Sequence, residues 1–229
     1  MSEVDAAALR PAPGSGSAPL VVTISASYGA AGSVIAPRLA ERLGVPWLDR
    51  MVSASTASES GSRATPEHLS DEEAATTPGS RLFTYLARAV GVNAIAPPDS
   101  LVDHDEELRA QAESDIGRLC ADGGVLLGRA GAVVLADRPA TVHLRLDGPV
   151  DRRVRRAVQI EGIDAEEARR RMADTDRART LYVRRLYHAD PTDPRLYNLV
   201  VDTTVLTVDA AVGLLADAVT AFRGGSPGW

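Results

Sequence analysis

Cysteine is nearly absent from the sequence: Cys120 is the only one among 229 residues. One cysteine cannot form an intrachain disulfide or a cysteine-rich zinc site, which favours a cytoplasmic protein. Long apolar runs are also missing. No stretch reaches the roughly 18 apolar residues of a membrane span, and residues 1–19 carry no basic start followed by an apolar segment. We therefore expect neither secretion nor membrane insertion.

An excess of positive charge is lacking as well. The chain has 31 acidic and 25 basic residues, a formal net charge of −6, which argues against a general nucleic-acid-binding protein. Any basic site must therefore be local. With 229 residues and 45% hydrophobic content, the chain can form one α/β domain with a small insertion. Neither composition nor patterning indicates an oligomeric state.

Short β-branched runs alternate with helical patterns along the chain. The run at residues 20–24 has no polar alternation, which is typical of a strand buried on both faces. A helical pattern follows up to Gly44, a stop signal, and Asp164 and Thr207 are placed to N-cap later helices. We expect further strands at 45–48, 125–127, 141–146 and 199–201, and helices at 34–43, 81–90, 99–121 and 133–136, twice within 150–187, and from 208. This alternation predicts an α/β fold with a parallel sheet of about five strands and helices on both faces.

The composition divides the chain into a domain and less regular segments. Residues 1–19 are rich in Ala, Pro, Gly and Ser, which predicts a disordered N-terminal tail. Residues 20–222 form the expected domain, and residues 223–229 form a loose C-terminal tail. Within the domain, we interpret residues 53–98 as an insertion and residues 150–190 as a helical lid.

A glycine-bearing turn, residues 27–33, separates the first strand from the first helix. Free backbone N–H groups and the positive end of the helix dipole suit such a position to phosphate binding. The ordinary phosphate-loop pattern G-x-x-x-x-G-K-[ST] is not met, because Gly32 stands where the lysine belongs and only Ser33 keeps a matching hydroxyl. The alternative is a simple strand-to-helix turn that needs Gly29 and Gly32 for tight packing.

Arginines are concentrated between residues 152 and 185, where eleven of them lie in an otherwise acidic protein. Arginine presents bidentate donors to phosphate oxygens, and phosphoryl transfer needs positive charge that closes over the transferring group. The alternative is ordinary ion pairing on helix surfaces, which we expect for roughly half of these arginines. Arg152 and Arg156 share one helical face, as do Asp176 and Arg179, so these four are the favoured catalytic residues.

A few other polar residues invite a functional interpretation. Asp49 follows a short strand and is either a substrate or metal contact or an N-cap. The Asp-His-Asp sequence at 103–105 lies on a predicted helix, where adjacent side chains point in different directions, which argues against a metal site. His143 lies inside a strand and is predicted to be packed or edge-facing rather than catalytic.

Three segments together resemble the cytidylate kinase-like protein family over about residues 20–220. The order of their motifs carries the resemblance: the phosphate loop, Leu-Gly-x-Pro-x-x-Asp, a Gly-Arg after the third strand, the arginine-rich segment, and a Tyr-x-Leu-Val-x-x-Thr strand. The segments are VVTISASYGAAGSVIAPRLAERLGVPWLDR, GGVLLGRAGAVVLADRPATVHLRLDGPVDRRVRR and DAEEARRRMADTDRARTLYVRRLYHADPTDPRLYNLVVDTTVLTVDAAV.

The resemblance implies a three-layer P-loop nucleoside monophosphate kinase fold. It implies transfer of the ATP γ-phosphate, with Mg²⁺, to CMP, dCMP or a related acceptor. Residues 53–98 would form the acceptor-binding region, Asp49 and Arg129 would face the acceptor, and Ser33 would contact the metal. The residues implied to be catalytic are Arg152, Arg156, Asp176 and Arg179. The loop residues implied to bind ATP are Tyr28, Gly29, Ala30, Ala31, Gly32 and Ser33.

The loop departs from the family's usual S-R-E-Y-G-S-G-G-R, because this chain has Ser-Ala-Ser-Tyr-Gly-Ala-Ala-Gly-Ser at residues 25–33. One well-placed electrostatic donor is typically worth about 10²–10³ in rate. An alternative function is therefore that of a nucleotide-binding or sensor pseudokinase of the same fold. A third is that of another P-loop kinase, which would accept a non-nucleotide better than CMP or dCMP.

Overall fold

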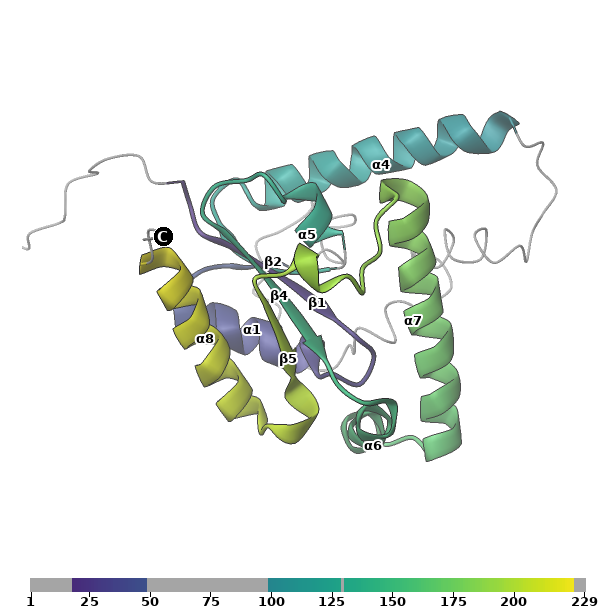
Figure 1. Cartoon of the computed structure of the whole chain (residues 1–229), viewed down its shortest axis with the longest axis vertical. Helices are drawn as coiled ribbons and strands as arrows, with labels where there is room; N and C mark the ends of the chain where they lie inside the picture. The colour runs from purple at the N-terminus through teal and green to yellow at the C-terminus, as the bar shows by residue number, and fades with distance from the viewer. Residues whose placement is uncertain (1–17, 49–98, 129, 225–229) are drawn as a thin grey trace, which may run out of the picture.

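The computed structural model describes residues 18–48, 99–128 and 130–224 (Figure 1). The expectations for residues 1–17, for Asp49, for the insertion with its helix at 81–90, for Arg129 and for residues 225–229 lie outside these ranges. The elements in chain order are β1 (Val21–Ala26), α1 (Gly32–Leu43), β2 (Trp47–Leu48), α4 (Asp99–Leu119), β3 (Gly124–Leu127), α5 (Gly131–Val134), β4 (Thr141–Asp147), α6 (Val150–Glu161), α7 (Ala165–Tyr187), η2 (Pro194–Leu196), β5 (Leu199–Asp202), η3 (Thr203–Val205) and α8 (Val208–Gly224).

The five strands form one parallel sheet in the order β2-β3-β1-β4-β5. β1 lies in the middle and all six of its residues are buried, as its β-branched sequence predicts. Val22 of β1 pairs with Val125 of β3 on one side and with Val142 of β4 on the other. The predicted five-stranded parallel sheet is therefore confirmed.

Helices cover both faces of this sheet (Figure 1). On one face, α1 and α8 contribute Ile35 and Leu215 to the largest core cluster. On the other, α4 and α7 contribute Ile116 and Val183 to a second cluster, together with α5. The result is the expected three-layer α/β architecture. None of the helices in the described part of the chain has the length and apolar character that a bilayer crossing requires.

A third, smaller cluster joins α6 and α7 to the turn that follows β1. Its centre is Tyr28, whose side chain is fully buried. The aromatic ring packs with Val154 and Ala157 of α6 and with Ala168 and Met172 of α7. This packing anchors both helices beside the carboxyl end of the central strand.

His143 and Cys120 are both packed in the interior, as the sequence predicted for His143. His143 is 8% exposed, and its Nδ1 lies 2.7 Å from the hydroxyl of Thr23 on β1. Burial lowers the pKa of His143, so the ring is neutral at physiological pH. Cys120 is 1% exposed and lies in the second core cluster. Both side chains therefore serve the core.

Two predicted helix boundaries are confirmed by backbone and side-chain geometry. α1 ends at Gly44, which has a φ of 66° in the left-handed region. Glycine takes this conformation without steric cost, so it stops the helix. α8 begins after Thr207, whose hydroxyl accepts a hydrogen bond from the N–H of Ala210 at 3.2 Å.

The N-cap of α7 is also formed, although without the reciprocal half of a capping box. The Asp164 carboxylate accepts hydrogen bonds from the N–H groups of Glu166 and Glu167, both at 2.9 Å. The Glu167 side chain accepts instead from Arg170 and Arg171. The nearby guanidiniums attract this carboxylate more strongly than a single backbone N–H does.

Replacing this cap is expected to weaken the protein modestly. Asp164→Ala removes both hydrogen bonds to the first turn of α7 and should lower the free energy of unfolding by about 1 kcal/mol. Urea denaturation followed by circular dichroism measures the change. Asp174→Ala on the exposed face of the same helix is the control. Equal losses in the two variants would contradict a capping role.

Candidate functional site

The turn after β1 brings a helix N-terminus to the carboxyl end of the central strand. α1 begins at Gly32 without a side-chain cap, and Ala31 before it has a φ of 61° in the left-handed region. Among the described residues, nothing accepts a hydrogen bond from the N–H groups of Ala31, Gly32 or Ser33. Backbone N–H groups left free at the positive end of a helix dipole form an anion-binding site.

A buried hydroxyl lies immediately before this turn. Ser25, near the carboxyl end of β1, is 2% exposed, and its Oγ has no hydrogen-bond partner in the part of the chain that the structure describes. Burying a polar atom without a partner costs about 1–3 kcal/mol. Such an atom suits a place where a polar or charged ligand binds. We therefore group Ser25 Oγ with the free N–H groups at the start of α1 as part of the candidate anion-binding site.

Four alternating charges, which we call the charge network, lie against this turn. They are Arg145 and Asp147 of β4, Arg153 of α6 and Asp176 of α7. Arg145 Nη2 is 2.9 Å from Asp147 Oδ2, Arg153 Nε is 3.7 Å from Asp147 Oδ1, and Arg153 Nη1 is 2.7 Å from Asp176 Oδ2. The side chains of Arg145 and Arg153 are only 9% and 10% exposed. The pairing offsets the cost of burying these two guanidinium charges.

The charge network holds the first half of the turn at three points. Arg145 Nη2 donates to the hydroxyl of Ser27 at 3.1 Å. Arg153 Nη1 donates to the carbonyl oxygen of Tyr28 at 2.9 Å, and the N–H of Tyr28 donates to Asp176 Oδ1 at 3.0 Å. Both backbone polar groups of Tyr28 are therefore used by the protein itself, whereas the N–H groups of Ala31, Gly32 and Ser33 have no partner among the described residues.

Asp147 lies at the centre of the charge network. Burial alone would raise the pKa of this carboxyl group, but the N–H of Gly148 and the guanidinium of Arg145 outweigh burial and hold the pKa below its usual range. The carboxylate is therefore ionised at neutral pH. It balances the two arginines between which it lies.

Arg152 and Arg156 share one face of α6, as predicted, and this face contacts the end of β5 and the segment that follows it. Arg152 Nη2 lies 2.5 Å from Asp202 Oδ2, and its Nε donates to the hydroxyl of Thr204. Arg156 donates to the carbonyl oxygens of residues 203 and 206 at 2.5 and 2.6 Å. Burial lowers the pKa of Arg156. In this structure both guanidiniums are bound to the chain.

Arg179 differs from the other favoured arginines. It is partly buried on α7, three positions after Asp176, which contacts the turn. Within the described ranges, no hydrogen bond or ion pair of its guanidinium is found. Residues three apart on a helix share a face. Arg179 is therefore the favoured arginine whose charge is available to a ligand near the turn.

The structure thus brings together most of the residues predicted for the site. The turn with Gly29 and Ser33 lies beside Asp176, and Arg152 and Arg156 reach the turn indirectly, because the hydroxyl of Thr203 donates to the carbonyl oxygen of residue 30. The residues predicted to bind the acceptor nucleotide, which are Asp49, Arg129 and residues 53–98, lie outside the described ranges. The roles of the individual residues in nucleotide binding and catalysis remain predictions.

Sequence reasoning did not single out three residues of the charge network: Arg145, Asp147 and Arg153. Arg145 carried a signal, since a charged residue inside a buried strand needs a partner. In the sequence, Asp147 is distinguished only by its position at the end of a predicted strand. Arg153 looked equivalent to its neighbours in an arginine-rich helix, and only the position of α6 against the turn distinguishes it.

Several arginines of α7 form ordinary surface pairs, as predicted for about half of the set. Arg170 pairs with Glu166 and Glu167, and Arg185 pairs with Asp105 of α4 at 2.6 Å. Exposed pairs of this kind contribute about 0–1 kcal/mol each. The Arg185 pair connects α7 to α4, whereas the Arg170 pairs lie within α7, and neither contacts the turn after β1.

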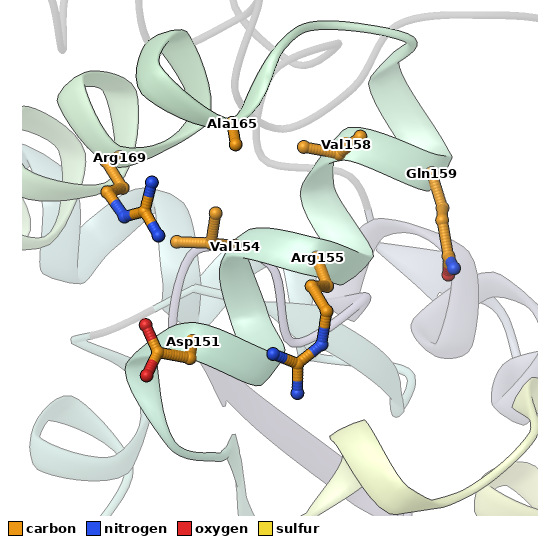
Figure 2. Close-up of a pocket in the computed structure, with 7 residues that line it drawn as sticks. All are labelled: Asp151, Val154, Arg155, Val158, Gln159, Ala165 and Arg169. Carbon is orange, nitrogen blue, oxygen red and sulfur yellow. The ribbon is translucent and has the colours of Figure 1, made fainter.

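A groove of about 530 Å³ lies between α6 and α7 (Figure 2). In Figure 2 the guanidinium of Arg169 is directed toward Val154, which forms part of the groove wall. Its lining residues are Asp151, Val154, Arg155, Val158, Gln159, Ala165 and Arg169. None of these is among the residues predicted for nucleotide binding or catalysis, although Val154 also packs against Tyr28 of the turn.

Residues 21–205, most of the chain, match the sequence profile of the cytidylate kinase-like family. The chain belongs to this family. One relative is the cytidylate kinase of Methanopyrus kandleri, which is 34% identical over 131 residues, 53% of this chain and 64% of that one. A uronate isomerase of Corynebacterium glutamicum is 32% identical over 113 residues, 49% of this chain but 22% of that one. The chain spans less than two thirds of the length of both relatives.

A solved structure supports the fold of this cytidylate kinase-like protein. It is an uncharacterized protein from Eubacterium ventriosum with a TM-score of 0.59 and 16% sequence identity. The alignment covers 89% of this chain and 99% of that one. With its parallel sheet and two helical layers, the protein therefore has an α/β fold consistent with that of P-loop kinases.

Proposed function

We propose that this protein is a nucleoside monophosphate kinase that transfers the γ-phosphate of ATP to CMP, dCMP or a related acceptor. The observation that carries the proposal is the open N-terminus of α1 at the end of the central strand. There the N–H groups of Ala31, Gly32 and Ser33 and the hydroxyl of Ser25 are without partners among the described residues. Membership of the cytidylate kinase-like family supports the same assignment.

In this proposal the backbone of Gly29–Ser33 binds the phosphates of ATP. The free N–H groups donate to phosphate oxygens, and the positive end of the α1 dipole stabilises their charge. The hydroxyl of Ser33, in the first turn of α1, would hold Mg²⁺. When bound with ATP, the metal neutralises charge on the phosphates.

Apart from that of the metal, the positive charge that acts on the transferring group must come from arginine side chains. All 25 basic residues of the chain are arginines, so no lysine anywhere can replace the one absent from the loop. Arg179 is assigned this role because its guanidinium is available and because it lies one turn from Asp176. Its planar fork suits phosphate oxygens. Asp49 and Arg129 are assigned to the acceptor nucleotide by the family resemblance.

A second function is favoured by a specific observation. Residues 25–33 include no charged side chain, and Arg152 and Arg156 are held by the segment after β5. A protein with these features could bind a nucleotide without transferring phosphate. In that case the α1 N-terminus would still bind phosphate, but no arginine would act during transfer.

One measurement distinguishes these functions. Purified protein is incubated with ATP, Mg²⁺ and a panel of nucleoside monophosphates and small non-nucleotide acceptors, and ADP formation is recorded together with the Kd for ATP. Turnover greatest with CMP or dCMP supports the kinase. ATP binding without turnover supports the nucleotide-binding protein, and preference for a non-nucleotide supports a different P-loop kinase.

A further inference from the structure

The charge network carries an inference beyond the assignment of the ATP site. Its members come from three elements, with Arg145 and Asp147 on β4, Arg153 on α6 and Asp176 on α7. The four charges alternate in sign and sum to zero. The network therefore adds no net positive charge to a bound phosphate. What it can supply is the position of the backbone that binds the phosphate.

Arg153 contacts two carboxylates of the charge network and two backbone carbonyl groups. Its Nε donates to the carbonyl oxygen of Gly148 at 2.9 Å, and its Nη1 donates to the carbonyl oxygen of Tyr28 and to Asp176. The backbones of Gly29 and Arg153 also lie close together, since a Cβ built on Gly29 would lie 2.3 Å from the carbonyl oxygen of Arg153. Helix α6 thus contacts the turn with both side chain and main chain.

Fixing Tyr28 fixes the peptide groups next to it. Arg153 binds the carbonyl oxygen of Tyr28 and Asp176 binds its N–H, so the peptide planes on both sides of the residue are set by side chains. The turn continues directly into the free N–H groups of Ala31 and Gly32. Donors that are already oriented bind an anion without the cost of reorganising first.

We propose that Arg153 is a positioning residue that orients the turn after β1 for phosphate, in place of the side-chain contacts that a lysine-containing loop would make. The inference rests on the proposed function, because it assumes that the turn binds the phosphates of ATP. It also implies coupling: ATP bound at the turn and α7 docked through Asp176 stabilise each other through Arg153.

The test uses Arg153→Gln, which removes the charge, and Arg153→Lys, which keeps the charge but cannot make three directed contacts. Arg155→Gln is the matched control, because Arg155 lies on the same helix and lines the groove between α6 and α7 (Figure 2), while the contacts to Tyr28 come from Arg153. Amide hydrogen exchange of residues 25–33 is measured in the full chain without nucleotide. The Kd values for ATP and for CMP are measured by calorimetry.

We expect exchange at Tyr28 to become about tenfold faster in Arg153→Lys and faster still in Arg153→Gln. Exchange in α8 should stay unchanged, as should exchange everywhere in the control. The Kd for ATP should rise about tenfold while the Kd for CMP stays the same. A purely structural role would instead accelerate exchange in α8 as well, and that result, or unchanged exchange at Tyr28, would overturn the proposal.

The exchange and binding measurements distinguish failure of this inference from failure of the proposed function. If the wild-type protein binds ATP but shows no turnover, the kinase assignment fails, while the exchange at Tyr28 and the Kd for ATP still test the role of Arg153. If it binds no ATP, the proposed function fails, and the inference that the turn is oriented for phosphate fails with it. Faster exchange at Tyr28 with an unchanged Kd for ATP would overturn the inference alone.

Discussion

Arg179→Ala is expected to lower the turnover of ATP with CMP or dCMP by about 10²–10³-fold while the fold stays intact. Within the described residues, the guanidinium of Arg179 has no hydrogen bond or ion pair to lose. It lies on α7 one turn beyond Asp176, which contacts the turn after β1. With no lysine in the chain, removing this charge leaves the transferring group without its assigned cation. ADP formation and thermal denaturation, measured in parallel, check both halves of the expectation.

The matched control is Arg177→Ala. Arg177 is exposed on α7 and lies two positions from Arg179, which places it on roughly the opposite side of the helix. Its removal subtracts the same charge from the same helix but should change turnover by less than about twofold. Equal losses in the two variants would point to a general electrostatic effect. Full activity in Arg179→Ala would show that this residue is not catalytic.

Most of the fold could be predicted from sequence because its signals are local. The buried strands are short β-branched runs, and the helix boundaries at Gly44, Asp164 and Thr207 depend on residues within a few positions. Such signals need no knowledge of the rest of the chain. The Asp164 cap was confirmed, while the Glu167 side chain pairs with the guanidiniums of α7 and not with the cap residue.

The site was less predictable because its contacts join residues far apart in sequence. Arg153 contacts Tyr28, which lies 125 positions earlier, and Tyr28 contacts Asp176, 148 positions later. Sequence spacing correctly placed Arg152 and Arg156 on one face of α6, yet it could not indicate which partner that face meets. Arg153, on the adjacent face, is the residue that contacts the turn. The choice between these faces is made by the packing of α6 against Tyr28 and not by any local pattern.

These contacts between residues far apart in sequence also explain how a loop without charged side chains can keep its conformation. Apart from Tyr28, whose ring packs against α6 and α7, the turn consists of small residues that have no charged side chain with which to fix the backbone. Here the contacts are supplied from outside by β4, α6 and α7. The turn is therefore held by the charge network around it, and substitutions in the charge network should change the conformation of the turn.

Gly29→Ala is expected to be among the most damaging single substitutions in the described part of the chain. Gly29 has a φ of +75°, which costs other residues about 1–2 kcal/mol. The added Cβ would also lie 2.3 Å from the carbonyl oxygen of Arg153. Forcing α6 away from the turn adds a further 1–3 kcal/mol or so. We expect the free energy of unfolding to fall by about 3 kcal/mol and ATP binding to weaken with it.

Gly44→Ala separates the two causes. Gly44 has a similar φ of +66°, but an added Cβ there meets nothing within 4 Å. It should therefore lose only the conformational part, about 1–2 kcal/mol, and bind ATP as the wild-type protein does. Urea denaturation and calorimetry of the two variants measure the difference. If both lose the same stability, α6 yields freely at Arg153, and the close contact between helix and turn does not constrain the phosphate site. If Gly29→Ala loses about twice as much or more, that contact is part of what holds the turn in place.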